Sequence, residues 1–149
     1  MKNALFNFKK VGFFSFLTLL VSLFILSCEP DGPIADPIIG SWKYVRNGII
    51  QNGVTTYSTP NCTNYSDATF NSDGTSVGYG LDENCASTNV INYKATWEKL
   101  PEANMYELNY SYGKTGKEAY TFIFSNSNNY LRVEHPFNNS IFIIEYSRK

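Results

Sequence analysis

The stretch MYELNYSYGKTGKEAYTFIF, residues 105–124, alternates apolar and polar side chains on either side of a short turn that contains glycine. Successive side chains of a β-strand point to opposite faces of a sheet, so this alternation is typical of strands that bury one face. The central GKTG, residues 113–116, supplies the turn-forming glycines between the two runs. The stretch therefore predicts two antiparallel strands, at 105–112 and 118–124, joined by a tight turn.

The same period of two extends over most of the chain beyond residue 40, and no segment sustains a helical period. Further strands are expected at 40–46, 49–58, 67–70, 75–79, 90–100, 130–134 and 140–147. Asn47-Gly48 is expected to turn the chain after the first of them. The alternation within that first strand predicts that Trp42, Tyr44 and Arg46 share one face.

These patterns predict an all-β fold of eight or nine antiparallel strands in up-and-down order. A meander of this kind removes its exposed edges when it closes into a barrel, which is the architecture we expect. A sandwich of two packed sheets is the alternative architecture.

The N-terminal segment has the features of an export signal. A 16-residue apolar run, Val11 to Leu26, follows three lysines, and it is shorter than the roughly 20 residues that a spanning helix needs. Ile25-Leu26-Ser27-Cys28, which overlaps the end of this run, resembles the bacterial lipobox, whose cysteine is acylated and becomes the first mature residue. We expect a lipoprotein signal peptide at 1–27 and attachment to a lipid bilayer through acylated Cys28. A signal peptide with a coincidental cysteine, or an uncleaved anchor, is the alternative.

Residues 28–37 are rich in proline and acidic residues, which favour an extended tether over a packed element. Residues 38–149 are then expected to form one domain. The signal takes three of the 12 basic residues and none of the 13 acidic ones, which leaves a net charge of about −4 and argues against nucleic-acid binding. The acid directly after Cys28 resembles the tethers of Bacteroidetes-type lipoproteins. We expect an outer-membrane lipoprotein that faces the periplasm or the cell surface.

Two cysteines, Cys62 and Cys85, remain once Cys28 is assigned to the lipid. An even pair in an exported chain favours a disulfide bond. Two free thiols, or half of a metal site, are the alternatives, although the chain has no CxxC motif and a single histidine.

Several features of the domain resemble the bacterial lipocalin-like lipoproteins over residues 38–149. They are Gly40-Ser41-Trp42 at the start of the first strand, the hairpin segment 69–75, Trp97 in a mid-chain strand, and an arginine directly after the last strand. The resemblance implies a barrel whose floor is closed by Trp42, with Arg148 packed over the indole. It also implies binding or transport of a small apolar or amphipathic molecule.

A barrel of eight strands is just wide enough to be filled by side chains or to hold one small ligand. Tyr106, Tyr110 and Phe122 fall on the faces expected to point inward, and we take them as ligand-binding candidates. The alternative is that such side chains fill the barrel, in which case the chain would be a structural or interaction lipoprotein of the cell envelope.

Catalysis is the least favoured class of function. The lone histidine, His135, is expected in a loop before Pro136, and no nucleophile elbow, phosphate loop or dinucleotide fingerprint occurs. Adjacent acids such as Asp82-Glu83 are typical of solvated turns. We therefore expect a non-enzymatic protein with no cofactor and no metal site.

Overall fold

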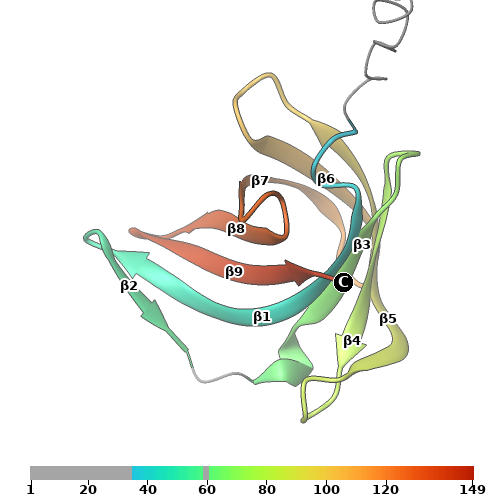
Figure 1. The fold of residues 1–149 in the computed structure, drawn as a ribbon, viewed down its shortest axis with the longest axis horizontal. Coiled ribbons are helices and arrows are strands. Elements are labelled where there is room, and N and C mark those ends of the chain that lie inside the picture. Colours follow the sequence, from blue (N-terminus) through green and yellow to red (C-terminus); the bar gives the residue numbers. More distant parts are fainter. Residues whose placement is uncertain (1–34, 59–60) are drawn as a thin grey trace, which may run out of the picture. The chain divides into compact units, whose positions relative to one another are not determined.

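The computed structural model describes residues 35–58 and 61–149, and this part of the chain forms nine strands (Figure 1). The strands are β1 (Gly40–Gln51), β2 (Val54–Tyr57), β3 (Ser66–Phe70), β4 (Thr75–Leu81), β5 (Ser87–Lys99), β6 (Met105–Tyr112), β7 (Gly116–Ser125), β8 (Tyr130–Phe137) and β9 (Ser140–Arg148). A short 3₁₀ helix, η1 (Cys62–Asn64), lies between β2 and β3. Cys28 and the predicted signal peptide lie outside the described residues.

The strands form one antiparallel sheet that closes on itself. Neighbours in the sheet follow the order β2-β1-β3-β4-β5-β6-β7-β8-β9, and β1 also pairs with β9. This additional pairing produces an eight-stranded barrel, to which β2 is attached as an extra strand. The predicted all-β, up-and-down barrel is confirmed, and the sandwich alternative is excluded because one continuous ladder runs through every strand.

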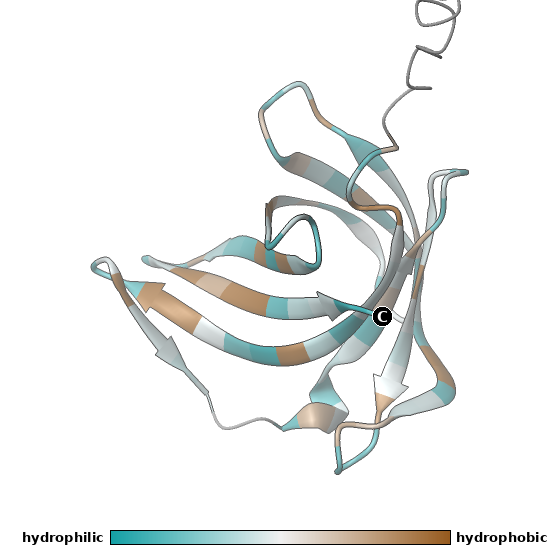
Figure 2. Cartoon of the chain, in the orientation of Figure 1, coloured by the Kyte–Doolittle hydropathy of each residue, from teal (hydrophilic) through white to brown (hydrophobic). Residues whose placement is uncertain are grey.

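Alternation along the strands sets which side chains enter the barrel. Figure 2 shows both apolar and polar residues along β1, whereas residues 141–144 of β9 are all apolar. The inward-facing set packs into a cluster that is dominated by large side chains. Its fully or nearly buried members are Ile38, Trp42, Ala68, Phe70, Ala95, Tyr106, Leu108, Phe122 and Leu131. Burial of such side chains is the main favourable term for folding, about 1.5–3 kcal/mol for each large apolar side chain.

The first strand is longer than the sequence predicted, because Asn47-Gly48 does not turn the chain. Both residues continue β1, where Gly48 pairs with Tyr57 of β2 on one side and with Ile143 of β9 on the other. A side chain at 48 would collide with β2, since a Cβ there would lie 2.5 Å from the carbonyl oxygen of Thr56. The turn is made instead at 52–53, where Asn-Gly adopts positive φ at both positions.

A β-bulge in β1 changes the face on which Arg46 lies. The register against β9 shifts between Tyr44 and Arg46, so Val45 is an extra residue without a partner. Trp42 and Tyr44 point inward as predicted, but Arg46 points outward, where its guanidinium bonds the carboxylate of Glu145. The prediction that all three residues share a face was wrong for Arg46, because a bulge reverses the alternation of the residues that follow it.

The carboxylate of Glu145 ties β2 to the outer face of the barrel. It accepts hydrogen bonds from Arg46, Tyr57 and Tyr130, which come from three different strands. Burial alone would raise the pKa of Glu145, but these hydrogen bonds outweigh that effect and hold the pKa below its usual value. The guanidinium of Arg46 also lies 3.7 Å from the centre of the Tyr57 ring. These contacts fix the short strand β2 against β1.

The last hairpin also differs from the sequence prediction. His135 and Pro136 belong to β8 rather than to a loop, and they pair with Phe142 and Ile141 of β9. Pairing between β7 and β8 ends at Glu134, so the end of β8 has a neighbour on one side only. Proline lacks a backbone N–H and is tolerated on such an edge.

Residues Asp36–Lys149 form one compact unit that contains every described strand and its own core. A unit of this size with a closed hydrogen-bonding network is expected to fold independently. Among the described residues, no helix is long and apolar enough to cross a membrane.

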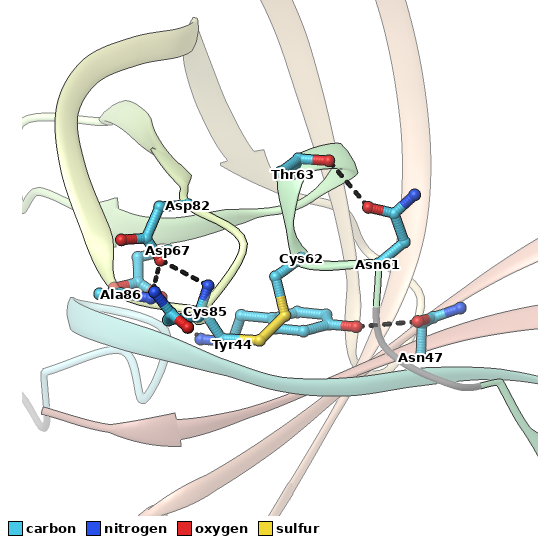
Figure 3. The surroundings of a disulfide bond; sticks show 10 residues. Tyr44, Asn47, Asn61, Cys62, Thr63, Asp67, Asp82, Cys85 and Ala86 are labelled. Atoms are coloured by element: carbon cyan, nitrogen blue, oxygen red, sulfur yellow. Dashed lines mark hydrogen bonds between the residues drawn. A yellow bond between two sulfur atoms is a disulfide. The ribbon is translucent and has the colours of Figure 1, made fainter.

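The predicted disulfide between Cys62 and Cys85 is present. It joins η1 to the loop between β4 and β5, and the ring of Tyr44 lies beside it with its hydroxyl bonded to Asn47 (Figure 3). The two cysteines are 23 residues apart, and closing a loop of that length contributes about 3 kcal/mol through the unfolded state.

Candidate functional site

One end of the barrel is closed by Trp42 and Arg148. These two residues are direct cross-strand partners on β1 and β9. The guanidinium carbon of Arg148 lies 4.4 Å from the centre of the indole, close enough for a cation–π interaction. The indole N–H donates to the carbonyl of Ile38 at 2.8 Å, and Trp42 is completely buried. Trp42 and Arg148, the two residues that the resemblance indicated, are thus in direct contact where the pairing of β1 with β9 ends.

The same arginine holds the chain that leads into the barrel. Its Nη1 and Nη2 donate to the carbonyls of Ile39 and Pro37, and its Nε donates to the carbonyl of Asn128. Gly40 makes this reach possible, because a Cβ at that position would lie 2.5 Å from Nη1 of Arg148. The glycine of the Gly40-Ser41-Trp42 motif therefore has a steric role, because the side chain of Arg148 occupies the space beside it.

Tyr106 belongs to this floor and not to a binding site. Its side chain is 1% exposed, and its hydroxyl donates to Asp36 at 2.7 Å. Burial and this hydrogen bond both raise the pKa of Tyr106. Asp36 also bonds the backbone of Ile38, so a residue that the sequence placed in the tether is part of the closed end. Tyr106, predicted as a ligand contact, is removed from the candidates because the packed floor covers it.

A cavity of about 380 Å³ occupies the barrel interior beyond the floor, within the range of small-molecule sites. Aromatic and aliphatic side chains from six strands form most of its walls, and two of the predicted ligand contacts, Tyr110 and Phe122, are among them. The inner walls comprise Tyr65, Ala68, Phe70, Tyr93, Leu108, Tyr110, Tyr120, Phe122, Leu131, Val133, Ile144 and Tyr146. Exposed residues at its outer edge include Asn64, Asn92 and Lys114.

Strand β4 contributes little volume to the interior because glycine occupies an inward position. Gly78 pairs with Tyr93 of β5, and the ring of Tyr93 lies where a Cβ of residue 78 would be. An aromatic side chain that covers a glycine on a neighbouring strand is a recurrent way of stabilising such positions. Gly78 therefore sets the position of the Tyr93 ring in the cavity wall.

A hydrogen-bonded network lies at one side of the cavity. The hydroxyls of Tyr110 and Tyr120 are 2.9 Å apart, and Tyr120 donates to the carboxylate of Glu118. Lys114 also donates to that carboxylate. Burial would raise the pKa of Glu118, but the hydrogen bonds from Lys114 and Tyr120 lower it, so the group is a carboxylate at neutral pH. The network is closed, with one positive and one negative charge that compensate each other.

Three cavity tyrosines were not predicted from the sequence: Tyr65, Tyr93 and Tyr146. Tyr93 shares its inward face with Ala95 and Trp97, and Tyr146 shares its face with Ile144. Their strands were predicted, so the alternation could have identified both residues. Tyr65 follows η1 and lies outside the strands. Only the three-dimensional arrangement stacks its ring on that of Tyr44, with the two ring centroids 4.8 Å apart.

Two of the cavity tyrosines should make the free energy of unfolding fall as the pH rises into the alkaline range. Burial raises the pKa of Tyr93 and Tyr146 in the folded protein, whereas an unfolded tyrosine ionises near pH 10. Above pH 10 the unfolded chain loses protons that the folded chain keeps, so the stabilisation present below pH 10 is lost as the pH rises. Each group should lower the free energy of unfolding by up to about 1.4 kcal/mol per pH unit.

Denaturant unfolding at pH 8, 10 and 11 measures this slope. The double variant Tyr93→Phe/Tyr146→Phe should show a clearly shallower decline above pH 10 than the wild-type chain, with each single variant in between. Equal slopes for all four proteins would contradict the burial of these two hydroxyls.

The described residues thus form a barrel with one closed end and a tyrosine-lined cavity. No protein-family model matches the chain, and neither a curated protein nor a solved structure shows significant similarity to it.

Proposed function

We propose that this protein is a lipocalin-like lipoprotein that binds or carries a small apolar or amphipathic ligand inside its barrel. Binding, and not catalysis, is the activity we propose. The observation that carries the proposal is the cavity of about 380 Å³ above the Trp42 floor. Taking about 30 Å³ as the volume of one water molecule, a dozen of them would fill this space.

The walls of the cavity support a ligand that is mostly apolar. Phe70, Leu108, Phe122 and Leu131 form the surface toward the floor, and these residues also belong to the packed core. Because the core holds them in place, the cavity is largely formed before a ligand binds. A preformed cavity loses little entropy when a ligand orders it, which favours affinity.

The attachment to a membrane is proposed from the sequence. The lipobox-like Ile25-Leu26-Ser27-Cys28 and the proline-rich segment after it support an acylated N-terminus and a tether to the barrel. We propose an outer-membrane location, on the periplasmic face or at the cell surface. Acyl chains on Cys28 would hold the barrel close to the bilayer, which is a source and a destination of apolar molecules.

The second candidate is a structural or interaction lipoprotein of the envelope. It requires a barrel filled by its own side chains, as the half around Trp42 and Tyr106 is. The cavity in the other half favours the ligand-binding function over this alternative.

The ligand-binding proposal predicts that the soluble chain, residues 29–149, takes up N-phenyl-1-naphthylamine, an uncharged probe that fluoresces in apolar surroundings. Val133 lines the cavity, so Val133→Phe should occupy part of its volume and weaken probe binding at least tenfold. The matched control is Val90→Phe at an exposed position of β5, which should leave the dissociation constant unchanged.

Native mass spectrometry of the full-length protein, exported by and purified from its own cells, should detect a bound small molecule that Val133→Phe reduces. Absence of probe binding to the folded wild-type chain, together with absence of a bound molecule, would favour the interaction function.

The membrane proposal predicts that Cys28→Ser moves the protein from the membrane fraction to the soluble exported fraction. The acyl chains on Cys28 are expected to hold the protein in the membrane, because two acyl chains anchor a protein far more strongly than one. Cell fractionation followed by immunoblotting measures this, with Cys62→Ser/Cys85→Ser as the control that removes other cysteines. Retention of the Cys28→Ser chain in the membrane after export would refute acylation at this residue.

A further inference from the structure

Two hydroxyls in the cavity wall have no hydrogen-bond partner. Tyr93 and Tyr146 are half-buried, and both line the cavity. Neither hydroxyl bonds any atom within the part of the chain that the structure describes, whereas Tyr44, Tyr106, Tyr110 and Tyr120 each have a partner. A hydroxyl that lines a cavity and has no partner in the protein can donate a hydrogen bond to a molecule held there, so these two are suited to bond a ligand.

Tyr93 on β5 and Tyr146 on β9 line the same cavity from different strands, and both pack against the core cluster beside it. The rings of Tyr93 and Tyr110 are in contact, with their centroids 5.6 Å apart. Of these three tyrosines, Tyr110 has a partner for its hydroxyl in Tyr120, which leaves the hydroxyls of Tyr93 and Tyr146 to a molecule in the shared cavity.

The cavity offers no free charge to a ligand. Among the described residues that line it, Lys114 alone carries a charge, and its ammonium is bonded to Glu118. A carboxylate or phosphate on a ligand would have to displace Glu118 from Lys114 or be buried without a counter-charge, which is costly. A ligand cation would meet the same paired arrangement. The chemistry of the wall thus favours a ligand without charge.

Aromatic rings form much of the remaining wall, beside aliphatic side chains such as Leu108 and Val133. The rings of Phe70 and Phe122 pack edge to face, with their centroids 5.8 Å apart. The rings of Tyr93 and Tyr110 pack in the same way, with their centroids 5.6 Å apart. Rings arranged like this present both faces and edges to a planar guest, which can pack in offset or edge-to-face contact. Flat ring systems would therefore use this surface better than a flexible chain, which also loses more entropy on binding.

We propose that the cavity selects an uncharged, planar ring compound bearing an oxygen acceptor, such as a ketone or quinone, and that Tyr93 and Tyr146 donate hydrogen bonds to this oxygen. The inference rests on the proposed function and adds the class of ligand to it. The two tyrosines act as specificity-determining residues, since their hydroxyls distinguish an oxygenated ring from a hydrocarbon of the same shape.

Three anthracenes of similar shape test the proposal. They are 2-acetylanthracene, which carries a carbonyl acceptor, 2-ethylanthracene, which lacks it, and anthracene-2-carboxylate, which carries a charge. Fluorescence titration of the soluble chain, residues 29–149, should give the tightest dissociation constant for 2-acetylanthracene and the weakest for the carboxylate.

The variants Tyr93→Phe and Tyr146→Phe remove only the hydroxyls. Each should weaken binding of 2-acetylanthracene about three- to tenfold, the effect of losing one net hydrogen bond, and should leave binding of 2-ethylanthracene within twofold. Tyr112→Phe, at an exposed tyrosine outside the cavity, is the matched control and should change neither. Because neither cavity hydroxyl has a partner in the protein, both variants should melt within a few degrees of the wild-type chain at neutral pH.

Equal affinities for the acetyl and ethyl compounds, with no effect of either variant, would overturn the ligand class and leave the proposed binding function intact. Tightest binding of the carboxylate would overturn it in favour of an anion site at Lys114. A large loss of stability in either variant would assign the hydroxyls a structural role. Failure of all three probes to bind the folded wild-type chain would contradict the proposed function itself.

Discussion

Pairing of β1 with β9 is the interaction on which the rest of the structure depends. It joins the first long strand of the domain to the last one and turns a meander into a closed barrel. The pairing ends at Trp42 and Arg148, where the arginine lies over the indole and bonds the carbonyls of the entering chain. Closure therefore fixes the register, seals one end, and orders the segment before β1.

The two ends of the barrel differ in how far side chains fill the interior. At the Trp42 end, side chains fill the interior, and the polar groups of Asp36 and Tyr106 bond each other. At the other end, the disulfide between Cys62 and Cys85 ties η1 to the β4–β5 loop, and the interior remains open. Glycine at 78 and the ring of Tyr93 define one wall of this space. Packed side chains thus fill one half of the barrel, whereas a disulfide braces the other half around the cavity.

The hydrogen bonding of Glu145 differs from that of two cavity tyrosines. On the outer face, the buried Glu145 is satisfied by three donors, and this arrangement holds β2 in place. Inside the cavity, the hydroxyls of Tyr110 and Tyr120 bond each other, whereas those of Tyr93 and Tyr146 bond no other described residue. Hydroxyls of this kind are available to a molecule in the cavity, which is the basis of the ligand class proposed above.

The alternation of side chains predicted the strands, the closed barrel and the inward position of Tyr110 and Phe122. It could not predict the bulge at Val45, because an extra residue is set by the fit to the neighbouring strand. Asn47-Gly48 misled the turn prediction, since a glycine inside a strand can serve close packing as well as a turn. Tyr106 was misassigned because a face shows which residues point inward but not how deep they lie. Depth depends on strand stagger, which no local pattern encodes.

If the Trp42–Arg148 pair locks the closed end of the barrel, Trp42→Ala should lower the free energy of unfolding. Removing this fully buried tryptophan should cost about 3–5 kcal/mol and should speed hydrogen exchange of the β1 and β9 amides together. A loss below about 1 kcal/mol, with exchange in both strands unchanged, would contradict this role of the pair.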